Sequence, residues 1–177
     1  MTTLTVPAPA APAAPAAAPA ASRLRGAVSA AAWRRARYAL CSLPLALLAA
    51  AASVVSPGVA RRYRALVRRS LGQPATPAPR RLVGRVLAHA LIGLPVNAAA
   101  TLVLGWLGYL SLINLAYPIR PLIGMIGFDP HAWGGPSYAG VWACHALAGG
   151  VPLLLLLLLT ARAFTGLQSR LARTLLG

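Results

Sequence analysis

The apolar run VLAHALIGLPVNAAATLVLGWLGYLSLINLAY, Val86 to Tyr117, decides the fold of this chain. A second apolar run, YAGVWACHALAGGVPLLLLLLLTA, covers Tyr138 to Ala161. Neither run contains Lys, Arg, Asp or Glu. About 20 apolar residues of helix cross the roughly 30 Å hydrocarbon core of a bilayer. The sequence therefore predicts two transmembrane helices, 86–117 and 138–161, joined by an outer loop, 118–137.

The charge of the chain is one-sided. Its 177 residues include 17 basic residues, all of them Arg, and one acid, Asp129. Only 10% of the residues are charged, fewer than in a typical soluble domain. Catalysis by a pair of carboxylates is excluded, so we expect no enzyme and no cofactor. A formal charge of +16 also suits nucleic acid, but the arginines flank apolar runs, which favours anionic lipids and predicts no nucleic-acid partner.

The arginines also predict the topology. Eight lie within 61–85, before the first long run; one, Arg120, lies in the loop; three follow the second run. Basic residues collect on the cytoplasmic side of membrane helices. We therefore expect a multi-pass protein of the cytoplasmic membrane, with loop 118–137 outside and the C-terminus in the cytoplasm.

The N-terminal third is harder to assign. Five prolines in the Ala-rich stretch 1–22 rule out a continuous helix and predict a disordered tail. The short apolar run 38–55 has Pro44 inside it and basic residues on both sides. As a straight helix it would be about 27 Å long, which is marginal for a span. A single crossing and a re-entrant segment kinked near Pro44 or Ser53 both remain open.

Basic segments follow the membrane segments. In 61–72, Leu66 and Leu71 share a helical face with Tyr63 and Val67, which predicts an amphipathic helix on the inner membrane surface. A solvated helix end is the alternative. A proline-containing linker, 73–85, comes next, and 162–177 predicts a second amphipathic helix. The expected fold is thus an all-α integral membrane protein with two transmembrane helices, a short N-terminal membrane segment and basic amphipathic helices.

The outer loop holds the first group of candidate site residues. An acid, an imidazole and an indole lie within five positions, next to a Gly-Gly-Pro turn, and together they suggest a patch that senses a small ligand or ion. An interfacial aromatic beside a solvated turn is the structural alternative. A metal ion would find two ligands here instead of the usual four, so no metal site is expected. The candidates are Asp129, His131, Trp133, Gly134, Gly135 and Pro136.

Four polar residues interrupt the long apolar runs: His89, Asn97, Asn114 and His145. Polar groups are costly in lipid and usually face protein. Asn97 and His145 are expected to hydrogen-bond between the two long helices if their depths match. Helix–helix contact and proton sensing are the two interpretations, and His145 is the best candidate for the second.

Three stretches carry a resemblance: RYALCSLPLAL from Arg37, WGGPSYAGVWACHAL from Trp133 and ARAFTGLQSRLARTLLG from Ala161. Residues 34–177 resemble the sensor domain found at the N-termini of actinobacterial two-component histidine kinases, a module of about four membrane helices in two hairpins. Here the first hairpin is shortened, and no kinase domain follows in this sequence.

The resemblance implies a free-standing, non-catalytic input module for signal transduction. Such a module would signal through its tail helix to a separate histidine kinase or another signalling protein. A structural or scaffolding membrane protein without a ligand is the alternative function. Self-association into a homo-oligomer is open in both cases.

Overall fold

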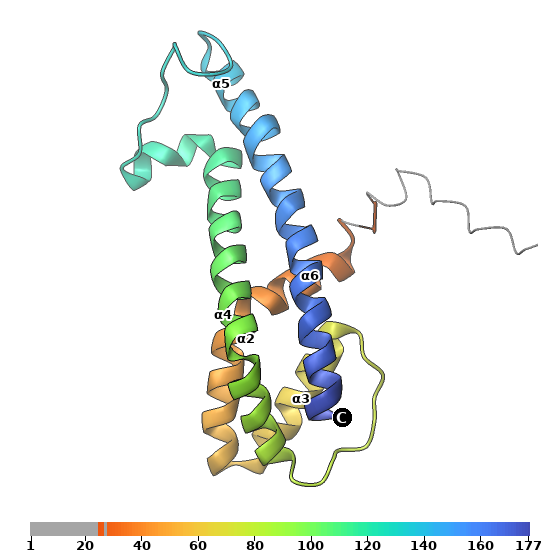
Figure 1. Cartoon of the computed structure of the whole chain (residues 1–177). Coiled ribbons are helices and arrows are strands. Elements are labelled where there is room, and N and C mark those ends of the chain that lie inside the picture. Colours follow the sequence, from red (N-terminus) through yellow and green to blue (C-terminus); the bar gives the residue numbers. More distant parts are fainter. Residues whose placement is uncertain (1–24, 27) are drawn as a thin grey trace, which may run out of the picture.

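The structure is a computed structural model that describes residues 25, 26 and 28–177; the tail predicted for 1–22 lies outside the described residues. The described part is helical and contains no strand. In chain order its elements are α2 (Ala30–Val55), α3 (Pro57–Leu71), α4 (Leu82–Leu115), the 3₁₀-helix η1 (Tyr117–Ile123), α5 (Tyr138–Cys144), the π-helix η2 (His145–Gly150) and α6 (Val151–Leu176) (Figure 1).

Three helices are long and apolar enough to cross a membrane: Ala30–Val55, Leu82–Leu115 and Tyr138–Leu176. The all-α class and the count of three apolar segments are therefore confirmed. The first helix is longer than its apolar run, because it begins at Ala30, where the Ser29 hydroxyl caps it by accepting a bond from the Ala32 amide at 3.3 Å. It also continues through Pro44 without a break.

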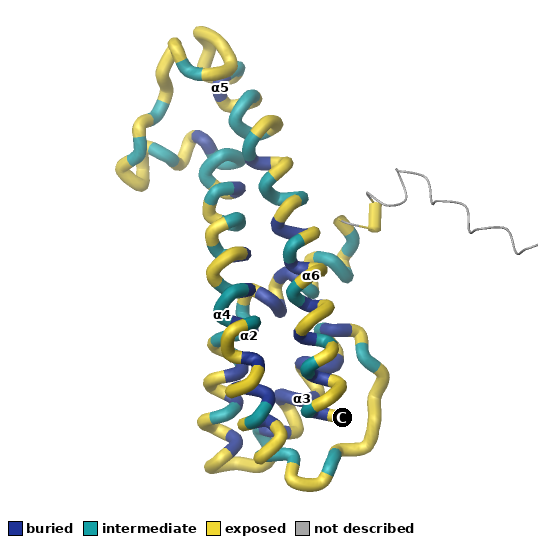
Figure 2. The backbone as a smooth tube through the Cα atoms, in the orientation of Figure 1, coloured by how far each residue is buried: buried dark blue, intermediate teal, exposed yellow. Residues whose placement is uncertain are grey.

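The two long helical segments form an antiparallel hairpin, and α2 covers only part of it. The Ala39 side chain of α2 packs with Ala100, about halfway along α4, and from there α2 runs back along the first half of α4 (Figure 1). Most buried residues lie in this half of the hairpin (Figure 2). Towards the outer loop the two helices stand alone, with large apolar side chains such as Leu102 and Leu147 exposed. Such an apolar surface is what helices facing lipid tails present.

Helix α3 packs its apolar stripe against protein, whereas we expected the apolar face of 61–72 to contact the membrane surface. Its buried stripe is Ala60, Tyr63, Val67 and Leu71, packed in one cluster with α2, α4 and α6, whereas Leu66 is 42% exposed. The reason is the tight connection at Ser56, after which Pro57 starts α3 directly and folds it back along α2. The apolar face predicted for the membrane surface is thus used inside the bundle.

The segment 162–177 is also not a separate helix. No break occurs at Arg162, and the helix that begins at Tyr138 continues to Leu176. The linker is shorter than the predicted 73–85, because α4 already begins at Leu82. Helices α5, η2 and α6 therefore form one continuous helical rod between the outer loop and the basic end of the bundle (Figure 1).

Candidate functional site

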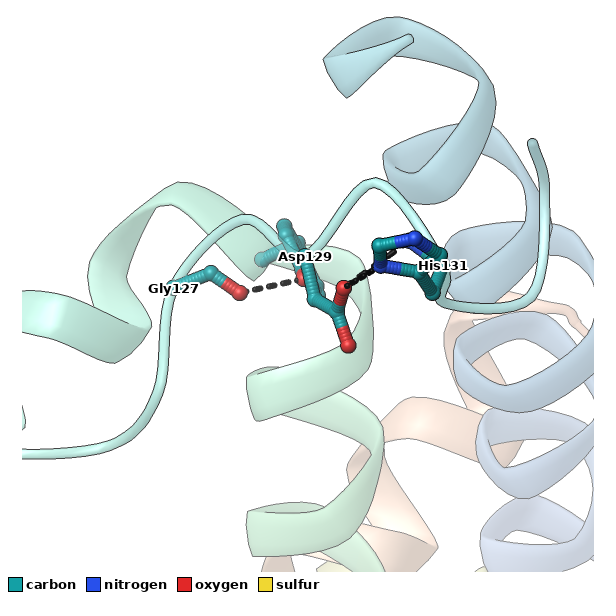
Figure 3. Close-up of polar contacts among 4 residues, drawn as sticks. Gly127, Asp129 and His131 are labelled. Carbon is teal, nitrogen blue, oxygen red and sulfur yellow. Dashed lines mark hydrogen bonds and ion pairs between the residues drawn. The ribbon is translucent and has the colours of Figure 1, made fainter. Parts of the chain in front are cut away.

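Asp129 and His131 form an exposed pair on the outer loop. The Asp129 carboxylate accepts a hydrogen bond from the His131 amide at 2.8 Å, and its oxygen lies 3.4 Å from Nδ1 of the His131 ring (Figure 3). The side chains are 52% and 92% exposed, respectively. This geometry is an ordinary Asx turn in solvent. Among the described residues, no three His, Cys, Asp or Glu side chains come close enough to hold a metal ion.

The Gly134–Gly135 turn packs on the start of α5. Both glycines have positive φ angles, 113° and 87°, and a Cβ on Gly134 would lie 2.4 Å from the Gly140 carbonyl oxygen. Only glycine tolerates this approach. Ser137, which follows Pro136, caps α5 by accepting a bond from the Gly140 amide at 3.1 Å. The turn therefore fixes the direction in which the last long helix begins.

Trp133 joins two of the polar residues of the long apolar runs at one cavity. The cavity has a volume of about 180 Å³ and lies between the end of α4, the loop and η2. We call it the outer cavity. Its lining residues are Asn114, Trp133, Cys144, His145, Ala148 and Gly149. Three residues that the sequence placed in two separate groups thus meet here, whereas Asp129 and His131 do not line this cavity.

Tyr117 is the centre of the packing beside the outer cavity. It is buried, and its hydroxyl donates a hydrogen bond of 2.6 Å to the Gly127 carbonyl. Its ring centroid lies 4.7 Å from that of His145 and 4.5 Å from the Arg120 guanidinium. Arg120 also donates to the Asn114 side-chain oxygen at 3.2 Å. Sequence reasoning missed Tyr117 and Arg120, although Arg120 is the one arginine of the predicted outer loop.

The π-helix η2 forms the wall of the outer cavity. Pro152 has no N–H, so the usual bond to the Ala148 carbonyl is impossible, and the Val151 amide bonds to Ala146 with π-helical spacing. Within this wider turn, Nδ1 of His145 lies 2.8 Å from the Val141 carbonyl. Since a carbonyl only accepts, Nδ1 is the donor in this contact.

Two glycines of η2 let α4 approach closely. A Cβ on Gly149 would lie 2.9 Å from the Asn114 side-chain oxygen, and one on Gly150 would lie 2.6 Å from the Leu115 side chain. The Ser111 hydroxyl donates to the Gly150 carbonyl at 2.9 Å. The irregular helix and the end of α4 are therefore locked together beside the outer cavity.

The other intramembrane polar residues bind partners that the sequence did not indicate. The bond expected between Asn97 and His145 does not form. Asn97 instead accepts a hydrogen bond of 2.9 Å from the Gln168 side chain. His145 lies on the same helical rod as Gln168 but roughly 35 Å away from it, at a rise of 1.5 Å per residue. Nδ1 of the buried His89 ring lies 3.2 Å from the Tyr63 hydroxyl of α3. His89 and Asn97 thus connect helices within the bundle.

At the basic end, Arg64 and Arg68 of α3 hold the end of the rod. Arg64 donates to the Leu176 carbonyl at 2.9 Å and to the Gly177 carbonyl at 3.0 Å, and Arg68 also donates to Gly177. Each arginine donates to the Thr76 hydroxyl at 2.6 Å. Burial, and then the charge of Arg68, lower the pKa of Arg64, but arginine stays charged at neutral pH. These bonds satisfy carbonyls that a helix end leaves unpaired.

No protein-family model, curated protein or solved structure matches this chain. The outer cavity is therefore interpreted from its own geometry. It offers an imidazole, a thiol, an amide and an indole, with Arg120 close behind the amide. This set of donors and acceptors suits recognition of a small polar molecule.

Proposed function

We propose that this chain is a non-catalytic membrane sensor that passes a signal from its outer cavity to a separate cytoplasmic partner. The proposal rests on a single helical rod that connects the two ends of the molecule. The rod Tyr138–Leu176 has the outer cavity at its first turns and the Arg64 and Arg68 contacts at its last residues. At 39 residues it is about 58 Å long, more than a bilayer core. A shift of such a helix is an established way to couple distant sites.

The π-helix supplies the two states that a sensor needs. A π-helical turn holds one residue more than the α-helical spacing. If the Val151 amide and its neighbours returned to α-helical bonding, with the Ala148 carbonyl still lacking a donor at Pro152, the following helix would rotate by about 100°. A ligand that contacts His145 and Gly149 stabilises one of these two bonding patterns over the other. The rotation then changes which face of α6 meets Arg64 and Arg68.

The proposed setting follows from the charge distribution. The arginine-rich end lies in the cytoplasm, where anionic lipids contact it, and the loop lies outside the cytoplasmic membrane. The proposed partner is a histidine kinase or another signalling protein that contacts the end of α6. This assignment rests on the resemblance of 34–177 to sensor domains and on the exposure of Arg170 and Arg173 beside that end.

A scaffold without ligand is the second candidate, and the buried polar pairs favour it. The Asn97–Gln168 and Tyr63–His89 contacts both connect helices. A scaffold requires such contacts and nothing more.

Cross-linking in native membranes separates the two candidates. The tagged chain is cross-linked, purified in mild detergent and analysed by mass spectrometry, together with His145→Phe and the control His131→Phe. His145 lines the outer cavity, whereas His131 is solvated. A sensor should recover a signalling protein, and His145→Phe should change that protein's yield or phosphorylation while His131→Phe leaves both unchanged. Recovery of the chain alone, or with its own copies only, would favour the scaffold.

A further inference from the structure

Two arginines from distant segments meet where the first turns of α2 cross α6. Arg35 of α2 and Arg162 of α6 line one cavity of about 210 Å³, at the crossing that Figure 1 shows. We call it the crossing cavity. Its other lining residues are Leu71, Thr165, Gly166 and Ser169. The same two arginines also line a smaller crevice next to it, together with Leu158 and Leu159.

The crossing cavity has positive charge and no protein counter-charge. The one acid of the chain, Asp129, lies on the outer loop. Within the described residues, neither Arg35 nor Arg162 donates a hydrogen bond or forms an ion pair. Arg35 is half-buried and Arg162 is exposed, so an anion from outside the protein can reach and pair with both guanidinium groups. At about 30 Å³ per water molecule, the volume equals about seven waters, which is enough for a phosphate group.

Ser169 adds a donor of the right kind. Its hydroxyl oxygen accepts hydrogen bonds from the Gln73 amide at 2.9 Å and from Arg173 at 3.0 Å, so its own hydrogen remains available to donate. Thr165 differs, because its hydroxyl already donates to the Ala161 carbonyl at 2.8 Å. The crossing cavity thus offers two guanidinium groups and one hydroxyl, a set suited to phosphate oxygens.

The surroundings indicate which phosphate compound fits. Arg162 is the first charged residue after the apolar run 138–161, and Leu158 and Leu159 lead from it along that run. A charged group bordered by an apolar surface matches a lipid better than a free ion. We propose that the crossing cavity binds the phosphate of an anionic phospholipid, whose acyl chain lies against the exposed Leu159. The proposal is independent of the outer cavity and of any signalling partner.

Native mass spectrometry of the full chain in detergent tests this proposal. Phosphatidylglycerol is titrated, with phosphatidylcholine as the neutral reference. The double variant Arg35→Gln with Arg162→Gln should weaken the binding of the first phosphatidylglycerol molecule by at least about tenfold, which is the effect of one lost charge-assisted hydrogen bond. The control pair, Arg61→Gln with Arg69→Gln, removes the same charge from exposed positions of α3 and should leave binding unchanged. An equal loss of lipid binding in both double variants would mean that general charge attraction holds the lipid, and would contradict a specific site in the crossing cavity.

A second variant separates binding from folding. A Cβ on Gly166 meets nothing within 4 Å, so Gly166→Leu fills the crossing cavity without a backbone clash and keeps both arginines. Gly84→Leu is the control, at an equally open position on α4. Gly166→Leu should lose the lipid and Gly84→Leu should keep it; retention in both would overturn the proposal. Excess inorganic phosphate should not displace the lipid, and displacement would assign the crossing cavity to free phosphate instead.

Discussion

The side-chain hydroxyl of Thr101 on α4 donates a hydrogen bond of 2.9 Å to the backbone carbonyl of Leu40 on α2. Leu40 lies four residues before Pro44, so its carbonyl is the one that loses its helical donor when proline replaces an N–H. A neighbouring helix thereby satisfies the group that Pro44 leaves unpaired. This explains how α2 remains one helix through a proline in the middle of an apolar run.

Replacing Thr101 by Val should lower the free energy of unfolding by about 1 kcal/mol, because the shape is kept and one hydrogen bond is lost. Denaturant unfolding in detergent micelles measures the change. In a Pro44→Ala background the helical N–H returns, and Thr101→Val should then cost almost nothing. Equal losses in both backgrounds would show that Thr101 does not compensate for the proline.

The Asn97–Gln168 pair should show strong coupling. Asn97→Leu leaves the buried Gln168 amide without its acceptor and should destabilise the chain by about 1–3 kcal/mol. The double variant Asn97→Leu with Gln168→Leu removes both polar groups and should recover most of that loss. A double-mutant cycle in detergent measures the coupling energy. Additive losses would mean that the two amides do not interact.

The sequence predicted the helices well and their contacts poorly. The runs 86–117 and 138–161 are uncharged and long, so composition alone indicates helices able to cross a bilayer. The partner of Asn97 depends on the register of two antiparallel helices, which no local pattern encodes. The register that pairs Ser111 with Gly150 at 2.9 Å places Asn97 beside Gln168 and leaves His145 at the outer cavity.

Helix α3 shows a second reason why contacts between helices were predicted poorly. Hydrophobic pattern assigns arginines to the solvent side, yet Arg64 and Arg68 are buried. Their charges are stabilised by backbone carbonyls at the end of α6, whose nearness is a tertiary property. The π-helix was missed for a related reason, since Pro152 indicates a disturbed turn but not whether the chain kinks or widens there.

Two glycine substitutions test the close approach of η2 to α4. Gly150→Ala places a Cβ 2.6 Å from Leu115 and should destabilise the chain by about 1–3 kcal/mol through overpacking. The matched change Gly166→Ala meets nothing within 4 Å and should stabilise α6 by about 1 kcal/mol through helix propensity. Thermal unfolding of both variants shows whether each substitution raises or lowers the stability of the chain. Stabilisation by Gly150→Ala would contradict the close contact.

Arg64→Gln should release the linker and the end of α6 together. The guanidinium donates to Thr76, Pro77 and two carbonyls of the last residues, and its loss should cost about 2 kcal/mol of local stability. Hydrogen exchange should then become roughly 30-fold faster in both segments. Arg61→Gln, at an exposed position of the same helix, should leave exchange unchanged. Faster exchange in only one segment would show that Arg64 does not join them.

The bonds from Arg64 to Leu176 also have a consequence for how the protein is made. The two residues are 112 positions apart in the chain. At 5–20 residues per second, a ribosome needs on the order of 10 s to add the residues between them. During that time α3 and the acceptors at Thr76 and Pro77 are already present, but the carbonyls of Leu176 and Gly177 have still to be made. The contact between α3 and the end of α6 can therefore form only after the last turn of the chain has been synthesised.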